Sequence, residues 1–263
     1  MISSSSNAKV KQIIRWRDRA GERRRDGVFI AEGIKMLEEA PEEDILEVYV
    51  SESALNRIAE KNEAVADKLK GHSFAAVKDD IFARMSDTCT PQGIITVMRR
   101  REYEAEDMLC AGDPLLLVLE SLQDPGNLGT IIRTAEGAGV SGVIMNPQTV
   151  DIYNPKTIRA TMGSIYRVPF AYADNLCELI AKCRKKGIHT YAAHLDGKNC
   201  YCEHSFSGPT AFIIGNEGNG LTGELADSAD TFIRIPMEGR VESLNAAVAA
   251  ALLMYEAHRQ RSL

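Results

Sequence analysis

The 263 residues are enough for one large domain or two modest ones, and 44% hydrophobic with 26% charged residues is the balance of a folded globular protein. No apolar run reaches the roughly 20 residues that cross a bilayer, and no apolar core of a secretion signal follows the first residues. The six cysteines include no CxxC pair, which fits a reducing compartment. We therefore expect a cytoplasmic protein without membrane association.

The formal net charge of −6 argues against general binding of nucleic acid, but the charges are unevenly distributed. Residues 1–30 carry eight basic and three acidic side chains, so the acidic excess lies in the rest of the chain. A basic arm on an acidic body can contact phosphates locally, although a charged run is also typical of a solvated helix face. The candidate RNA-binding residues are Lys9, Lys11, Arg15, Arg23, Arg24 and Arg25.

The first part of the chain alternates short helical and strand-like segments, which predicts a small α/β layer. Helical spacing covers residues 7–25, 33–40 and 53–70, and strand patterns cover residues 28–31, 46–50, 73–77 and 93–98. Residues 99–112 are charged and lack a strand pattern, so we interpret them as a linker. We expect one domain over residues 1–105 and a second over residues 106–263.

The second part predicts a larger α/β domain. Residues 115–119 are a continuous apolar run, typical of a strand that is buried on both faces. Further strands are expected at residues 142–145, 190–193, 211–214 and 231–235, with helices between them and a last helix over residues 243–259. This alternation indicates a mainly parallel sheet with helices on both faces.

The first loop that could carry chemistry follows the strand at residues 115–119. Pro125-Gly126 is predicted to make its turn, and Asn127 suits the cap of the following helix. Arg133 lies off the apolar stripe of that helix among small neighbours, so another surface can approach its guanidinium. Ligands of open α/β sheets bind at such strand ends, although the local pattern alone favours an ordinary cap and an ordinary exposed arginine.

The other two loops are also at predicted strand ends. Residues 215–221 place three glycines around Glu217, more than a tight turn needs, and the spacing lacks the ending of a Walker loop. Residues 235–245 run from a strand-ending Ile235-Pro236 into a helix that Ser243 could cap. The small side chains after Asn245 let that helix pack closely on other backbone, but alanine also favours helices in general.

Two other types of site are disfavoured. Gly137-Ala138-Gly139-Val140-Ser141-Gly142 matches the glycine pattern of a dinucleotide fold, but it follows a helix and precedes a strand, the reverse of the required order. Cys200, Cys202 and His204 have poor spacing for a tetrahedral zinc site. We therefore expect no metal, and no nicotinamide cofactor.

Taken together, the three loops resemble the signature motifs of the SpoU/TrmH family of RNA methyltransferases, within the SPOUT class. The motifs are Asn127-Leu128-Gly129 with Arg133, Gly215-Asn216-Glu217 with Gly220-Leu221, and Ile235-Pro236-Met237 with Ser243-Leu244-Asn245. Each is moderately specific, whereas their ordered set is highly specific. The resemblance is strong over residues 113–260 and weaker over residues 3–100, which look like the family's ribosomal-protein-like substrate-binding domain.

The resemblance implies a function, a cofactor and an architecture. The expected reaction is 2′-O-methylation of a ribose by S-adenosylmethionine, in ribosomal RNA in preference to transfer RNA because of the extra N-terminal domain. The catalytic domain should contain a trefoil knot and form a homodimer with active sites near the interface. The implied cofactor-binding residues are His194, Leu195, Gly215, Asn216, Gly220, Ile235, Met237, Leu244, Asn245 and Ala246.

By the same resemblance, the catalytic residues are Arg133, Asn127, Glu217, Ser243 and Asn245. A guanidinium stays protonated at neutral pH, so we favour Arg133 as a clamp on phosphate and developing negative charge, with the proton leaving to RNA phosphate or water. Glu217 is the alternative base on condition that burial raises its pKa. A non-catalytic RNA-binding protein of the same fold is the competing interpretation.

Overall fold

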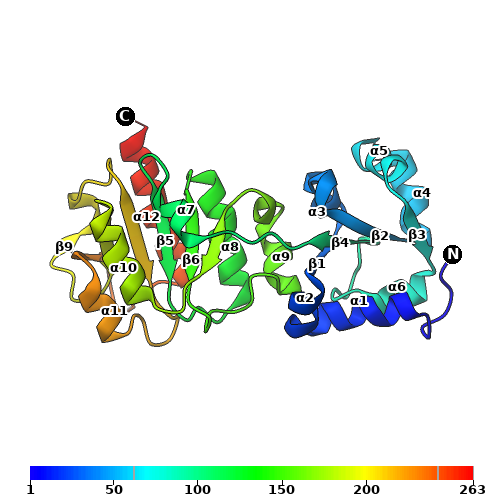
Figure 1. Ribbon diagram of the computed structural model, residues 1–263, viewed down its shortest axis with the longest axis horizontal. Coiled ribbons are helices and arrows are strands. Elements are labelled where there is room, and N and C mark those ends of the chain that lie inside the picture. Colours follow the sequence, from blue (N-terminus) through cyan, green and yellow to red (C-terminus); the bar gives the residue numbers. More distant parts are fainter. Residues whose placement is uncertain (62, 242, 263) are drawn as a thin grey trace. The chain divides into compact units, whose positions relative to one another are not determined.

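The computed structural model describes residues 1–61, 63–241 and 243–262, and the chain divides into two compact units. The first unit contains Met1–Arg101 and Asp151–Tyr166, and the second contains Glu102–Val150 and Arg167–Leu263. Figure 1 shows the elements of both. Among the helices of the described residues, none is both long and apolar enough to cross a membrane.

The first unit is a four-stranded mixed sheet with helices on both faces (Figure 1). Its strand order is β1-β4-β2-β3, with β4 antiparallel to β1 and β2, and β3 parallel to β2. One face packs on helices α1 and α6 through residues such as Val10, Ile13 and Phe82, and the other on α3, α4 and α5 through Leu37 and Ile58. The strands are β1 (Val28–Glu32), β2 (Ile45–Ser51), β3 (Phe74–Val77) and β4 (Ile94–Arg99). The helices are α1 (Ala8–Asp18), α2 (Ala20–Asp26), α3 (Ile34–Glu39), α4 (Glu52–Lys61), α5 (Glu63–Gly71) and α6 (Asp79–Met85), with a 3-10 turn η1 (Glu42–Asp44).

Residues 151–166 belong to the first unit although they follow the first strands of the second. They form α9 (Pro155–Thr161) and the 3-10 turn η2 (Ser164–Tyr166). The rings of Tyr153 and Tyr166 lie 4.7 and 6.3 Å from the ring of Phe29, and the Tyr166 hydroxyl donates to the carbonyl of Met36 at 3.0 Å. Aromatic contacts therefore attach this segment to the first sheet.

The second unit is a seven-stranded sheet in which every pairing is parallel, so the predicted α/β class with a mainly parallel sheet is confirmed. The strand order is β7-β6-β5-β10-β8-β11-β9. The strands are β5 (Leu115–Leu119), β6 (Gly142–Met145), β7 (Phe170–Tyr172), β8 (His189–Ala193), β9 (Asn199–Cys200), β10 (Thr210–Ile214) and β11 (Thr231–Arg234). The helices are α7 (Ala105–Leu109), α8 (Pro125–Gly137), α10 (Leu176–Lys185), α11 (Gly223–Ser228) and α12 (Ala246–Arg261), with a 3-10 turn η3 (Tyr201–Glu203).

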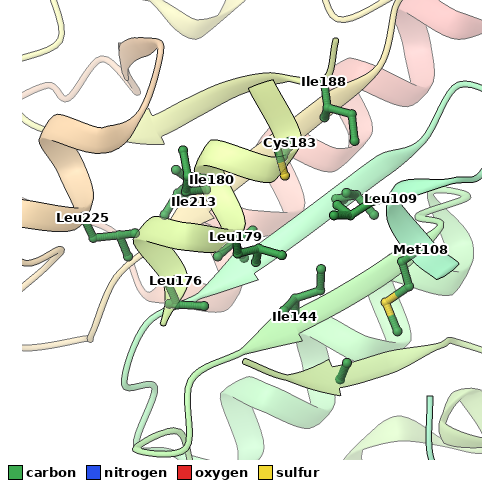
Figure 2. Packing of buried hydrophobic residues seen from close by; sticks show 14 residues of the cluster. Met108, Leu109, Ile144, Leu176, Leu179, Ile180, Cys183, Ile188, Ile213 and Leu225 are labelled. Atoms are coloured by element: carbon green, nitrogen blue, oxygen red, sulfur yellow. The ribbon is translucent and has the colours of Figure 1, made fainter. Parts of the chain in front are cut away.

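One face of this sheet is covered by α7, α10 and α11. Figure 2 shows Met108, Leu179 and Leu225 of these helices among the buried side chains that cover Ile144 and Ile213 of the strands. The predicted linker at residues 99–112 is therefore partly wrong, because Met108 and Leu109 are buried apolar anchors of α7. The sequence did not predict this helix because only two apolar residues, Met108 and Leu109, mark it among charged neighbours.

Helices α8 and α12 pack against each other, and their starts differ from the prediction. Helix α8 begins at Pro125, and Asp124 is its cap, accepting from the Asn127 amide at 2.9 Å. Proline has a fixed φ suited to a first helical position, so Pro125-Gly126 opens the helix instead of turning the chain. Helix α12 is capped by Asn245 and not by Ser243, since the Asn245 side chain accepts from the amides of Ala247 and Val248.

Candidate active site

The loops that follow β8, β10 and β11 surround a hollow of about 420 Å³ in the second unit. Because the sheet is parallel, these loops all leave from its carboxyl edge. Glu217 and Ser243 also line the hollow. The predicted cofactor-binding residues that line it are His194, Leu195, Gly215, Asn216, Gly220, Ile235, Met237, Leu244 and Ala246.

The loop after β10 closes on itself. Asn216 and Gly220 exchange two backbone hydrogen bonds of 2.9 and 3.0 Å, and the Asn216 side-chain oxygen accepts from the amides of Gly218 and Asn219. A Cβ atom on Gly215 would lie 2.2 Å from the carbonyl carbon of Gly220, so this position admits only glycine. The loop is thus compact, and its own hydrogen bonds hold its shape.

A chain of side-chain hydrogen bonds joins the three predicted loops. The Glu217 carboxylate accepts from the amides of Gln123 and Asp124 at 3.1 Å and from the Asn127 side chain at 3.0 Å. The Asn127 side-chain oxygen then accepts from the Asn245 amide group at 2.9 Å. Because Asp124 and Asn245 cap α8 and α12, this chain fixes the starts of both helices relative to the loop after β10.

The Glu217 carboxylate is held as an anion. Partial burial raises its pKa, but the hydrogen bonds from Asn127 and from the amides of Gln123 and Asp124 outweigh that effect, so its pKa lies below the ordinary value. The condition under which Glu217 would be a base, a raised pKa, is therefore not met. The geometry gives Glu217 the role of a clamp on the start of α8.

A second set of polar contacts, which the sequence did not reveal, supports the same edge from β5 and β6. Ser121 has a φ of 54°, and its carbonyl accepts from the Asn216 side chain at 2.7 Å. The buried Asn146 side chain accepts from the Ser121 amide at 2.8 Å and donates to its hydroxyl at 2.9 Å. Asn146 therefore holds a left-handed serine that orients Asn216. The signal available in the sequence was only one asparagine after a strand.

A wider hollow of about 600 Å³ lies beside α8 and α12. Asn127 and Asn245 line it together with Tyr201, and α12 contributes an apolar wall that includes Val248 and Tyr255. Asn245 thus differs from the other predicted cofactor-binding residues, since it lines this hollow. Asn127 is hydrogen-bonded to Glu217, which lines the smaller hollow, and to Asn245. The two asparagines therefore lie at the boundary between the two hollows.

Arg133 lies on α8 with an exposed side chain. Within the part of the chain that the structure describes, its guanidinium makes no hydrogen bond or ion pair. It is not among the residues that line either hollow. This exposed position lets the guanidinium of Arg133 contact a second molecule.

The basic residues of the first unit divide into two groups. Arg23 is 3% exposed, and its guanidinium donates to the carbonyls of Trp16 and Arg17 and to Asp151 at 2.5 Å. It belongs to the interior and does not contribute to an exposed basic surface. The other predicted RNA-binding side chains are exposed. Two of them form ion pairs, Lys9 with Glu47 and Arg25 with Glu22 and Asp26. The other three exposed side chains are Lys11, Arg15 and Arg24.

Residues 1–61, 63–241 and 243–262 contain no cluster of three histidine, cysteine or acidic side chains that could hold a metal ion. A hollow at the carboxyl edge of a parallel sheet is the usual place of a ligand site in α/β proteins.

Comparison with known proteins makes this class specific. The model of the SpoU rRNA Methylase family matches residues 114–255, more than half of the chain, and the model of the MRM3-like substrate binding domain matches residues 7–96. The chain belongs to the SpoU rRNA methylase family. These matches confirm the predicted family membership.

One relative and two solved structures indicate how far the similarity extends. The 23S rRNA (guanosine(2553)-2′-O)-methyltransferase RlmP of Bacillus subtilis is 34% identical over 256 residues, 97% of each chain. The crystal structure of an AdoMet-bound rRNA methyltransferase from Sinorhizobium meliloti has a TM-score of 0.84 at 30% identity and covers 98% of this chain and 97% of that one. AviRb from Streptomyces viridochromogenes, in complex with AdoMet, has a TM-score of 0.85 at 25% identity over 97% of this chain and 98% of that one.

Proposed function

We propose that the protein transfers the methyl group of S-adenosylmethionine to a ribose 2′-hydroxyl of ribosomal RNA. The observation that carries this proposal is the hydrogen-bonded chain from Glu217 through Asn127 to Asn245, which joins three loops and links the two hollows. The named relatives, an rRNA 2′-O-methyltransferase and AdoMet-bound structures, support the substrate and the cofactor. The six cysteines are free thiols, which suits a reducing compartment and supports a cytoplasmic location.

The smaller hollow fits the cofactor by size and chemistry. Its volume of about 420 Å³ lies in the range of small-molecule sites, and backbone groups of residues 215–220 can hydrogen-bond polar ends of a nucleoside and amino acid. Gly215, with no room for a Cβ, lets this loop close on itself beside the hollow. When bound, S-adenosylmethionine supplies a methyl group that its sulfonium already activates, so the protein needs no metal for that purpose.

The protein's own residues have to position the ribose and stabilise charge. In this proposal Arg133, whose side chain is exposed, binds the phosphate beside the target ribose and the negative charge that develops on its 2′-oxygen. It stays protonated, so the proton passes to RNA phosphate or water. Asn127, Glu217 and Asn245 keep α8, and with it Arg133, in a fixed position relative to the hollow. Ser243 borders the hollow and shapes it.

The proposal includes a homodimer that uses the outer face of α12. Val248, Leu252 and Tyr255 are 48, 36 and 50% exposed on this helix and lie along the wider hollow. A second copy of the chain would cover these apolar side chains and bring its own surface next to Asn127 and Asn245. Leu252→Glu is expected to give monomers in analytical ultracentrifugation, whereas the matched control Leu46→Glu on the exposed side of β2 leaves the dimer intact. A dimer that tolerates Leu252→Glu would contradict this part of the proposal.

The trefoil knot is a further part of the proposal. Support comes from β10, which lies between β5 and β8, while β11 lies beyond β8, so the chain doubles back across the sheet before α12 starts. An electron density map of crystals, traced through residues 210–250, tests it. A chain that reaches α12 without passing through a loop would contradict it.

Methyl transfer tests the function directly. Purified protein with S-adenosylmethionine labelled in its methyl group is expected to label 23S ribosomal RNA, and each labelled linkage should resist alkaline hydrolysis because its 2′-oxygen is methylated. Label in transfer RNA alone would overturn the substrate. Label at alkali-sensitive linkages would overturn the ribose target. Binding of RNA without any transfer would favour a non-catalytic RNA-binding protein.

A further inference from the structure

Two cysteines outside the proposed site lie side by side at the edge of the second sheet. The Sγ atoms of Cys200 and Cys202 are 2.7 Å apart, and both residues are free thiols. A disulfide bond is about 2.05 Å long, so the two sulfurs need to approach by less than an ångström. Cys202 is exposed and Cys200 is half-buried, so a small oxidant can reach the pair.

The backbone on either side holds the two thiols together. Cys200 is the last residue of β9, which pairs with Ile233 and Arg234 of β11, and Cys202 lies in the 3-10 turn that follows directly. The pair is a two-sulfur site and not part of a larger one, because the described residues contain no third ligand near enough to complete a metal site. Two thiols in contact, without a metal to hold them, are a substrate for oxidation.

We propose that Cys200 and Cys202 form a reversible disulfide when the protein meets a small-molecule disulfide such as oxidised glutathione. One cysteine thiolate attacks a glutathione sulfur and releases a glutathione thiolate, leaving a mixed disulfide. The second cysteine thiolate attacks the protein sulfur of that bond and releases the other glutathione. The two thiols lose two electrons and two protons, and one oxidised glutathione becomes two reduced molecules.

The bond has a regulatory and not a structural character. Its ring encloses a single residue, Tyr201, and rings this small are strained and easily reduced. Tyr201 lines the wider hollow together with Asn127 and Asn245, so closing the ring alters the backbone of a residue beside the proposed site. By contrast, Cys183 is buried, so an oxidant in solution does not reach its thiol.

Peptide mass spectrometry of the full chain tests the proposal without any activity assay. Trypsin cuts after Lys198 and Arg234, and the peptide over residues 199–234 contains Cys200 and Cys202 and no other cysteine. After treatment with oxidised glutathione and alkylation, this peptide is expected to lack two hydrogens and to carry no alkyl group. Reduction with dithiothreitol should restore two alkylated thiols.

Variants separate pairing from general thiol reactivity. Cys202→Ser should abolish the loss of two hydrogens and leave at most one glutathione on Cys200, whereas Cys110→Ser, which removes another exposed thiol, should leave the disulfide unchanged. Two alkylated thiols, or two bound glutathiones, on the 199–234 peptide at oxidant concentrations that modify Cys110 would overturn the proposal. Failure of the proposed methyl transfer would not affect this result.

Discussion

The two units of the protein use charged side chains in opposite ways. In the first unit, Arg23 and Glu32 are 3 and 7% exposed, and their partners are backbone groups and side chains of the same interior. In the second unit, Glu217 has as many hydrogen-bond partners but lies exposed at the carboxyl edge of the sheet. The number of hydrogen bonds therefore does not tell whether a charged side chain stabilises the interior of a unit. The position of the side chain relative to the sheet decides whether it supports the core or a ligand-binding loop.

Sheet topology explains the difference. A parallel sheet gathers the loops after successive strands at one edge, and each loop needs polar groups to hold its shape. The strands of the mixed sheet in the first unit run in both directions, and its buried charges lie at separate places. Arg23 joins α2 to the end of α1 and to Asp151, and Glu32 joins β1 to residues 86–88. Substitutions that remove one charge in each unit should therefore have different effects.

The largest effect is expected at Arg23. Arg23→Ala leaves Asp151 without its guanidinium and the carbonyls of Trp16 and Arg17 without their donor, so the free energy of unfolding of the first unit should fall by about 3 kcal/mol. Fluorescence of Trp16, the only tryptophan, reports urea unfolding of this unit. The neighbour Arg24 is the control: Arg24→Ala should change the free energy by less than about 0.5 kcal/mol and weaken RNA binding. Equal destabilisation by both would erase the contrast between interior and surface.

Arg133 should show the reverse, a large catalytic effect at no cost in stability. Arg133→Lys is expected to lower methyl transfer by about 10²- to 10³-fold, because lysine keeps the charge but cannot form the bidentate contact. Calorimetry should find S-adenosylmethionine bound as tightly as before, since Arg133 lines neither hollow. Arg84→Lys, another exposed arginine on a helix, controls for the substitution itself. An Arg133→Lys enzyme with full turnover would remove Arg133 from the mechanism.

A substitution of Gly215 tests whether cofactor binding at the edge of the parallel sheet depends on the close contact between Gly215 and the backbone of Gly220. Gly215→Ala would place a Cβ 2.2 Å from backbone of Gly220, so the loop has to open, and affinity for S-adenosylmethionine should fall at least about tenfold. Gly218→Ala is a matched control in the same loop, because its Cβ would lie 3.5 Å from the nearest atom. The comparison is made by calorimetry. Similar losses in both variants would indicate general sensitivity of the loop instead of this one contact.

The sequence predicted all four strands of the first unit and five of the seven strands of the second, and it missed only the short edge strands β7 and β9. A continuous apolar run such as Leu115–Leu119 has few interpretations other than a buried strand, and three loops at strand ends have to meet at one edge. Arg23 could not be placed in the same way, since it lies in a run of arginines whose periodicity does not distinguish it. Its burial depends on Asp151, which is 128 residues away.

The candidate site was predictable as a set of residues but not as a set of contacts. The pattern brought Asn127, Glu217 and Asn245 together, but gave no reason to choose a clamp over a base for Glu217. That choice depends on which backbone amides face the carboxylate in the folded chain. Ser121 and Asn146 were missed for the same reason, because a left-handed serine leaves no mark in the sequence.

The smallest effect concerns the pH dependence of Glu217. Its lowered pKa stabilises the folded chain above the unfolded carboxyl's pKa of about 4.3, and this contribution is lost as the pH falls through the lower folded value. Glu217→Gln removes the anion, so it should lower the free energy of unfolding of the second unit by about 1 kcal/mol near pH 7 and by less near pH 3. Urea unfolding followed by circular dichroism measures both, with Glu224→Gln on exposed α11 as the control. If the destabilisation by Glu217→Gln instead grows as the pH falls, the pKa of Glu217 is raised in the folded protein. Glu217 would then fit the role of a base and not that of an anion that holds the start of α8.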